Sequence, residues 1–319
     1  MIRTLHIFHI MKRFLYQVIC TVAFFILIPV VFTLLIQGSG ESAVENLGLF
    51  SSTETAEYEF DEGILPGIIA NEISMDTEEE AIKAQAVIAR TNALRAMEKG
   101  DNLPEGLTEG EMIKLWGQEN FSEYYSLLER CIEATRGIVM VHNGSLIRAD
   151  FHRSSAGYTR DASDIYEKEE FPYLKSADSR MDLPSEDFLK VMFYSPKRLI
   201  EEGGDLFGEE IRGSISEQTA EGLLSKISVT KRDSAGYVTE VAIDGNLHSG
   251  EEVRLLYGWN SSAFSMKEVD GEIRIVTKGL GHGLGLSLYG ANCLAREGYS
   301  YEDILKYFYA EIEFVAQYD

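Results

Sequence analysis

The chain has 319 residues and a formal net charge of -23 at pH 7, from 29 basic and 52 acidic side chains. Duplex nucleic acids are bound largely through Lys and Arg contacts to phosphates, so this composition excludes a general nucleic-acid-binding protein. The cysteines, Cys20, Cys131 and Cys293, are too few for a disulfide framework, and their spacing fits no zinc site. One disulfide between Cys131 and Cys293 and two free thiols both stay open.

An almost wholly apolar stretch, residues 15–36, predicts a transmembrane helix. Its length of about 22 residues is enough to cross a hydrocarbon core of roughly 30 Å. Arg3, Lys12 and Arg13 precede the stretch, and positive residues flank the cytoplasmic side of a span. We therefore expect a cytoplasmic N-terminus, and an extracytoplasmic location for residues 38 onward.

The N-terminal region divides into an anchor and a linker. Residues 1–37 are expected to form a cytoplasmic stub and single-pass membrane anchor, and residues 38–61, rich in Ser, Gly, Glu and Thr, a solvated linker. A cleaved signal peptide is the alternative, with small residues 38–40 at the cleavage site. Met11 is an alternative start. The remaining residues, 62–319, suit one large domain or two small ones.

The first predicted elements of this domain are a short apolar segment and a long helix. Residues 64–70 are apolar and predict a buried strand or turn. Thr77 and Glu80 have capping-box spacing and predict the start of a helix that ends at Gly100. Within this helix a stripe of small and aliphatic residues at helical spacing predicts close packing against a neighbour. The stripe comprises Ile82, Ala86, Ala89 and Ala93.

The rest of the domain mixes short helices with strands. We expect a loop over residues 101–110, then a hairpin over 137–151 that turns at 142–144. Further predicted elements are helices broken by Gly203 and Gly204 within 185–225, strands over 227–239, 240–247 and 273–277, a helix from Ser300 and Asp303 to Tyr307, and a strand near 312–315. This order lacks βαβ regularity and predicts an α+β fold.

Glu72 is the first candidate for chemistry. An apolar run precedes it, so burial is expected to raise the pKa of its carboxyl, as a general acid at neutral pH requires. Lys83 and Arg90 lie seven residues apart on one face of the following helix, where they could orient an anionic glycan or hold the carboxylate. The alternatives are that Glu72 is a solvated surface residue and that both cations pair with acids such as Glu79 and Glu80.

Residues 81–91, AIKAQAVIART, resemble the helix A-L-K-A-Q-A-x-A-A-R-T of the stage II sporulation protein D family of peptidoglycan lytic transglycosylases. Residues 71–74, NEIS, stand where the family usually has Gly-Glu-Met-Pro, and the Glu is retained. The resemblance implies that Glu72 is the catalytic acid. It also implies that Lys83, Gln85 and Arg90 are substrate-binding residues.

A middle segment, residues 151–159, resembles the family motif F-H-x-x-S-G-G-x-T, and FPYLKS follows at 171–176, as in the family. By itself a histidine here could equally belong to the core. A Ser–His nucleophilic pair is disfavoured because the G-x-S-x-G elbow is absent from the sequence. The resemblance implies that side chains of these segments position the sugar, namely His152, Ser154, Ser155 and Tyr173.

Some family members bind zinc near this middle segment through Cys and His. Here Arg153 follows His152, and the nearest cysteine in the sequence is Cys131. We therefore expect no metal site and no cofactor.

A glycine-rich segment, residues 279–291, resembles the family motif G-R-G-x-G-H-G-V-G-M-S-Q-Y-G-A. Alternating glycines suggest that the backbone closely approaches a ligand or another element. A phosphate loop is the competing interpretation, but no Lys-Ser or Lys-Thr follows. Leu288 replaces the usual Gln, and His282 and Ser287 are candidates for lining a groove.

The resemblance covers residues 62–315 and is weakest over about 184–272, which we expect to form a second lobe or an insertion. It implies mixed helices and antiparallel strands around a substrate groove, preceded by one N-terminal transmembrane helix. It also implies cleavage of peptidoglycan glycan strands, preferably strands stripped of stem peptides, with anhydro-muramic products. Implied partners are a cell-wall amidase and a membrane protein of an engulfment complex during sporulation.

Three alternatives stay open. A glycoside hydrolase would use a second carboxylate, for which Asp161, Asp164 and Asp178 are available. A tethered, non-catalytic chain could bind glycan and activate an amidase. A generic extracytoplasmic sugar-binding domain would keep its binding when Glu72 is changed to Gln.

Overall fold

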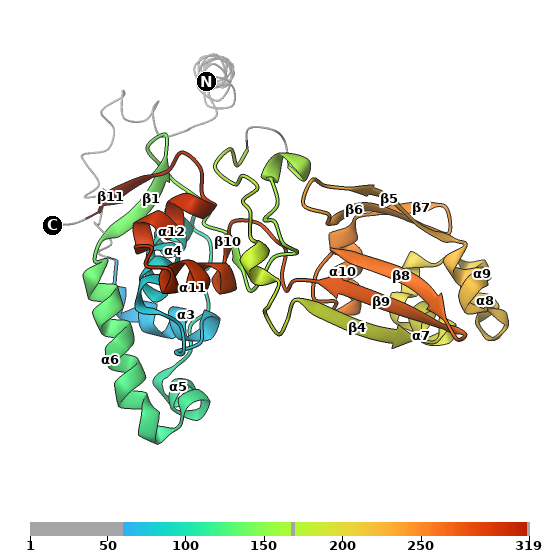
Figure 1. The fold of residues 1–319 in the computed structure, drawn as a ribbon, viewed down its shortest axis with the longest axis horizontal. Helices are drawn as coiled ribbons and strands as arrows, with labels where there is room; N and C mark the ends of the chain where they lie inside the picture. The colour runs from blue at the N-terminus through green and yellow to red at the C-terminus, as the bar shows by residue number, and fades with distance from the viewer. Residues whose placement is uncertain (1–59, 167–169, 318–319) are drawn as a thin grey trace, which may run out of the picture. The chain divides into compact units, whose positions relative to one another are not determined.

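The computed structural model describes residues 60–166 and 170–317, which form a mixed α+β fold with mainly antiparallel sheets (Figure 1). The predicted transmembrane stretch, residues 15–36, lies outside the described residues. No helix within the described residues combines the length and hydropathy needed to span a membrane.

A long helix organises the first part of the domain. The predicted helix is confirmed as α4 (Glu79–Lys99), and Gly100 ends it with a φ of 69°, in the left-handed region. The predicted stripe is buried in a cluster with residues of the neighbouring helices. These neighbours are α3 (Leu65–Glu72), α5 (Glu109–Trp116) and α6 (Gln118–Ala134).

The prediction of a strand or turn over residues 64–70 is wrong, because these residues belong mostly to helix α3. Pro66 lies in its first turn, where a fixed φ favours a helix and the missing N–H costs nothing. Every residue from Leu65 to Ala70 is buried. A segment buried on all sides shows neither helical nor strand periodicity, which is why the apolar run was ambiguous.

The predicted capping box at the start of α4 is also wrong. The N-cap is Glu78, whose side chain makes no capping hydrogen bond. Glu80 instead accepts hydrogen bonds from the Lys83 Nζ and from the backbone N–H of Tyr301. The carboxylate therefore serves a tertiary contact across the chain.

The predicted hairpin is confirmed in its first half. Strand β1 (Ile138–His142) pairs with β2 (Ser145–Leu146) through a turn in which Asn143 and Gly144 have positive φ, and the predicted terminal strand β11 (Glu313–Ala316) pairs with the other edge of β1. The second half departs from the hairpin. Strand β3 (Phe151–His152) pairs in parallel with β10 (Leu286–Ser287), so the middle and glycine-rich segments lie side by side.

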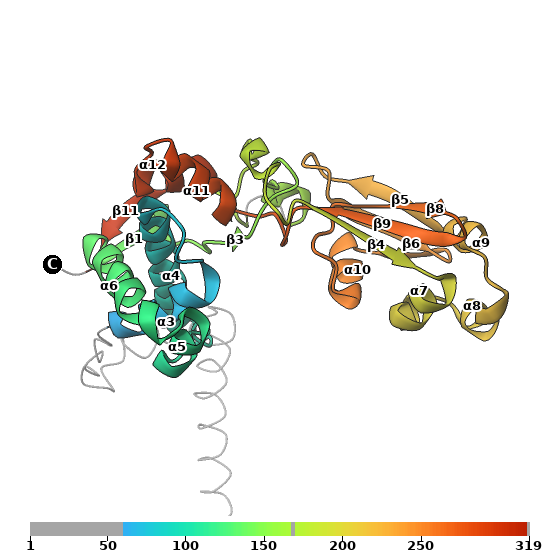
Figure 2. The same ribbon diagram turned by 60° about the horizontal axis from the view of Figure 1, so that its bottom comes forward.

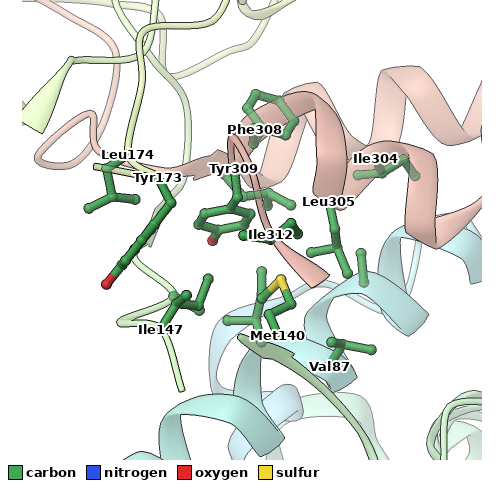
Figure 3. Close-up of a cluster of buried hydrophobic side chains, with 14 of the residues drawn as sticks. Val87, Met140, Ile147, Tyr173, Leu174, Ile304, Leu305, Phe308, Tyr309 and Ile312 are labelled. Carbon is green, nitrogen blue, oxygen red and sulfur yellow. The ribbon is translucent and has the colours of Figure 1, made fainter. Parts of the chain in front are cut away.

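The C-terminal helices pack against the first part of the domain. Helix α11 (Leu288–Arg296) and the predicted α12 (Tyr301–Phe308) both contact α4, and Figures 1 and 2 show them beside it. Ser300 caps α12 by accepting from the Asp303 N–H. Val87 of α4, Met140 of β1 and Leu305 and Phe308 of α12 meet in one buried cluster (Figure 3).

A second group of elements builds its own buried cluster from residues between 192 and 275. Two three-stranded antiparallel sheets, β4-β9-β8 and β5-β6-β7, belong to it. The strands are β4 (Leu189–Tyr194), β5 (Ile227–Arg232), β6 (Val238–Ile243), β7 (Asn246–His248), β8 (Phe264–Val269) and β9 (Glu272–Lys278). The helices are α7 (Pro196–Gly203), α8 (Glu209–Gly213), α9 (Ala220–Leu224) and α10 (Gly250–Tyr257).

This group agrees only partly with the sequence predictions. The break at Gly203 and Gly204 is confirmed, because α7 ends there. β4, β8 and α10 were not expected. The region contributes a distinct core, but its boundaries as a second lobe remain a prediction.

Candidate functional site

Glu72 is the last residue of α3, and its side chain meets the long helix α4. The Gln85 Nε2 donates a hydrogen bond of 2.8 Å to the Glu72 Oε2. Gln85 is almost fully buried, and its Oε1 has no hydrogen-bond partner among the described residues. A buried amide on a rigid helix therefore fixes one carboxyl oxygen of Glu72 and leaves the other available.

Burial raises the pKa of Glu72 from 4.5 to about 7, against a smaller lowering effect of the Gln85 hydrogen bond. Removal from water disfavours the charged carboxylate, and no cation contributes to the shift. At neutral pH the carboxyl group is therefore divided between its protonated and ionised forms. This is the condition for a general acid that later acts as a base.

The two cations predicted to assist Glu72 have other partners. Lys83 forms an ion pair of 2.5 Å with Glu80. Arg90 is fully buried, and its guanidinium binds both carboxylate oxygens of Glu62 at 2.7 and 2.9 Å, as well as the Ile138 carbonyl. These contacts give Arg90 a structural role between α4 and β1 and do not expose it to a ligand.

The turn that follows Glu72 is held by the helix after the glycine-rich segment. The Glu78 N–H donates to the Asn292 Oδ1 of α11 at 2.9 Å. Leu288, the first residue of α11, packs against both the α4 cluster and the C-terminal cluster. The first and last motifs of the sequence therefore meet on α4, although some two hundred residues separate them.

A buried carboxylate joins the serines of the middle and glycine-rich segments. Asp182 accepts from the Ser155 backbone N–H at 2.6 Å, from the Ser179 Oγ at 2.9 Å and from the Ser287 Oγ at 2.8 Å. Burial raises the pKa of Asp182, and these hydrogen bonds oppose the rise. No local pattern in the sequence marks Asp182, because two of its partners, Ser155 and Ser287, lie 27 and 105 residues away.

The remaining serine of the middle segment also makes an internal contact. The Ser154 Oγ accepts from the Leu280 N–H at 3.2 Å, and both residues are joined again through their backbones. Ser154, Ser155 and Ser287 are all at most 1% exposed. The structure therefore places the three predicted sugar-binding serines in the connection between two chain segments.

The two predicted histidines lie together, with ring centroids 5.9 Å apart. The His152 Nδ1 lies 3.0 Å from the Leu284 carbonyl, to which it must donate, so the buried Nε2 keeps a lone pair without a partner among the described residues. Burial and the neighbouring His282 lower the pKa of His152 to about 3. His152 is therefore neutral and internal, whereas His282 lines a cavity.

Tyr173 lies in the hydrophobic core between the β1–β2 hairpin and the C-terminal segment (Figure 3). It is 7% exposed, and its hydroxyl accepts from the Arg148 N–H at 2.8 Å. Its ring lies 5.6 Å from that of His142. These contacts are structural, so Tyr173 joins Arg90 among the predicted site residues that the structure places inside.

The acids considered as a second carboxylate are engaged elsewhere. Asp161 pairs with Lys175, Asp164 accepts from Ser234, and Asp178 pairs with Arg180. The Arg180 contacts lower the pKa of Asp178, which keeps it ionised. Within the described part of the chain, each of these acids therefore has a local partner of its own, and none forms a hydrogen bond with Glu72.

Residues 60–166 and 170–317 contain no group of three His, Cys, Asp or Glu side chains placed to hold a metal ion. Cys131 and Cys293 are both free, and burial raises the pKa of the Cys131 thiol to about 11. Of the two possibilities for these cysteines, the structure shows free thiols.

Comparison with known proteins shows what the chain is similar to. The family described as "Stage II sporulation protein" matches residues 52–142, which include Glu72 and Gln85. Stage II sporulation protein D of Bacillus amyloliquefaciens is 30% identical over 262 residues, 77% of this chain and 72% of that protein. Its namesake in Bacillus subtilis (strain 168) is 30% identical over 261 residues, 76% of this chain and 71% of that protein. The amidase enhancer of the same strain is 26% identical over 289 residues, 77% of this chain and 39% of that protein.

Proposed function

Because this chain belongs to the stage II sporulation protein D family, we propose that it is a lytic transglycosylase acting on peptidoglycan glycan strands, with Glu72 as its one catalytic carboxyl group. The observation that carries the proposal is the carboxyl of Glu72, whose pKa burial raises to about 7. The fixed amide of Gln85 orients it, at 2.8 Å. A single group with this pKa can both give and take a proton near neutral pH.

The reaction divides into two proton transfers. Protonated Glu72 gives its proton to the glycosidic oxygen, the bond from that oxygen to the anomeric carbon of muramic acid breaks, and an oxocarbenium-like centre forms. The Glu72 carboxylate then removes the proton from the primary hydroxyl of the same muramic acid. That oxygen bonds to the anomeric carbon, the anhydro ring closes without consuming water, and Glu72 is protonated again.

Gln85 supports both halves of this cycle. Its Nε2–H stays on the Glu72 Oε2, which leaves the other oxygen to exchange the proton. A hydrogen bond to the carboxylate favours the ionised form and opposes the rise in pKa caused by burial. Gln85 thereby keeps the pKa of the Glu72 carboxyl near 7 and fixes the orientation of this carboxyl.

Product analysis with matched variants tests this proposal. Denuded glycan strands are digested with the wild-type chain, with Glu72→Gln and with Asp76→Asn, which changes an exposed acid on the same turn. We expect anhydro-muramic ends, one water lighter than reducing ends, from the wild type and Asp76→Asn. Loss of general acid catalysis predicts that Glu72→Gln is slower by at least about 100-fold. Equal activity of the two variants would remove Glu72 from the mechanism.

A second candidate function is activation of a cell-wall amidase without glycan cleavage. It is favoured by the similarity to the amidase enhancer of Bacillus subtilis. In that case the wild-type chain would bind glycan and increase amidase turnover but release no glycan fragments, and Glu72→Gln would activate equally well. The transglycosylase therefore loses its activity with this substitution, whereas the amidase activator keeps its own.

We also propose that residues 1–37 anchor the chain in the cell membrane, with the described domain on the outer side. The apolar stretch at 15–36 and the preceding positive residues support this topology. An amidase that removes stem peptides would supply denuded strands, within an engulfment complex. Membrane fractions that release the chain on carbonate washing, without detergent, would contradict the anchor.

A further inference from the structure

A cavity of about 630 Å³ opens beside His282 and shares no lining residue with the Glu72 site. Its walls come from the segment before β3, residues 160–166, β5, β6, the start of α10 and the glycine-rich segment. A volume of this size is in the usual range for a small-molecule site. The side chains that matter below are Thr239, Glu251, His282 and Tyr166.

Two side-chain oxygens of residues that line the cavity are shielded from solvent and lack partners. They are the Thr239 Oγ1 and the Glu251 Oε2, and no described residue forms a hydrogen bond with either. The other oxygen of Glu251 binds the Arg254 guanidinium, with the Nε at 2.8 Å. Buried polar atoms are rarely left unsatisfied, so two of them in one cavity wall point to a ligand that supplies donors.

His282 offers the complementary donor. The Leu284 N–H donates to the His282 Nδ1 at 3.1 Å, so in the neutral ring the proton must be on Nε2. Burial lowers the pKa of His282, which keeps the ring neutral at physiological pH. No hydrogen bond to Nε2 occurs within the described ranges, and this N–H is therefore available to a ligand acceptor.

Some of the charged groups around the cavity are already paired. Arg148 pairs with Asp150 and lies over the Tyr166 ring, at 5.0 Å from its centroid, and Arg160 pairs with Asp233. In the whole lining, charges of the two signs nearly balance and leave little net charge for an ionic ligand to neutralise. The basic residues are Arg148, Arg160 and Lys231, and the acidic ones are Asp150, Asp164, Glu240 and Glu251. The cavity instead combines hydrogen-bonding groups of both kinds with a ring and apolar side chains, which suits an uncharged polyhydroxylated molecule.

We propose that this cavity is a second saccharide-binding site, in which Thr239, Glu251 and His282 bind the hydroxyl and acetamido groups of one N-acetylated amino sugar. The identification of the sugar rests on the proposed function, whereas the class of ligand rests on the cavity itself. The Glu251 carboxylate accepts from a sugar hydroxyl, and the Thr239 hydroxyl and the His282 Nε2–H complete the set. The site holds a sugar away from the bond that Glu72 cleaves.

Isosteric removal of one hydroxyl tests the site. In the full-length Glu72→Gln chain, which leaves strands uncut, we compare Thr239→Val with Thr277→Val by calorimetric titration with N-acetylglucosamine and with a denuded tetrasaccharide. Thr277 is a matched control because its buried hydroxyl also lacks a partner but does not line the cavity. Thr239→Val is expected to weaken binding at least about fivefold, the effect of one lost hydrogen bond, at an unchanged or higher melting temperature.

The two ligands distinguish the source of the sugar. Binding of both supports a site for free sugars, and binding of the tetrasaccharide alone supports a site for a strand, in each case provided that Thr239→Val weakens it. Equal affinities of the two threonine variants, or no saccharide binding by the parent chain, would overturn the proposal. If Thr239→Val weakens saccharide binding but the wild-type chain makes no anhydro products, the proposed transglycosylase function is refuted and the proposed saccharide site is supported.

Discussion

The raised pKa of Glu72 has a consequence for stability that can be measured without any substrate. The folded chain holds the proton of Glu72 up to about pH 7, whereas the unfolded chain releases it near pH 4.5. Above this window the folded chain contains a partly buried carboxylate, which costs up to about 3 kcal/mol at roughly 1.36 kcal/mol for each pH unit between the two values. Below pH 4.5 the group is neutral in both states, and this cost disappears.

Glu72→Gln removes the ionisable group but keeps its shape and the possibility of a hydrogen bond with Gln85. We therefore expect the variant to be more stable than the wild type by about 2–3 kcal/mol at pH 8, with the difference vanishing near pH 4. Urea denaturation of both chains across this pH range measures the two free energies of unfolding. All other titratable groups contribute equally to both, so they cancel in the difference. A stability difference that is independent of pH would refute the argument that burial shifts this carboxyl.

Three further substitutions test the surrounding structure. Gln85→Met removes the hydrogen bond that favours the Glu72 carboxylate, so the pKa of Glu72 is expected to rise. The alkaline limb of the pH–activity profile then moves to higher pH, and an unmoved limb would contradict the role of this contact. Arg90→Met removes the guanidinium that pairs with Glu62, and the free energy of unfolding from urea denaturation should fall by about 3–5 kcal/mol. Adding Glu62→Gln to this variant should restore part of that stability. Asp182→Asn places an amide against several donors and should lower stability by about 2 kcal/mol, whereas an unchanged melting temperature would show that this carboxylate is dispensable.

The sequence predicted best those elements whose signals are local. The end of α4 at Gly100, the turn at Asn143 and Gly144 and the Ser300 cap of α12 each depend on a few adjacent residues. Helix α3 was missed because its burial on all sides removes any periodicity. The Thr77 capping box failed because α4 begins one residue later, with Glu78 as its N-cap, and because Glu80 accepts from the Tyr301 N–H instead.

The same distinction applies to the candidate site. Glu72 and Gln85 were identified from their motif, and the structure places them in contact. The roles of Arg90, Tyr173 and the serines could not be predicted, because a polar residue in a motif can bind a ligand or join two segments. Only the tertiary partners, such as Asp182 for Ser287, decide between these roles.

The origin of the oxygen at the new glycan end tests the central claim most directly. Denuded strands are digested by the wild-type chain in water enriched in heavy oxygen, and the products are weighed. Transglycosylation by Glu72 predicts anhydro-muramic ends without any label, because the muramic acid's own hydroxyl closes the ring. Labelled reducing ends would show that water is the nucleophile, and would contradict transglycosylation.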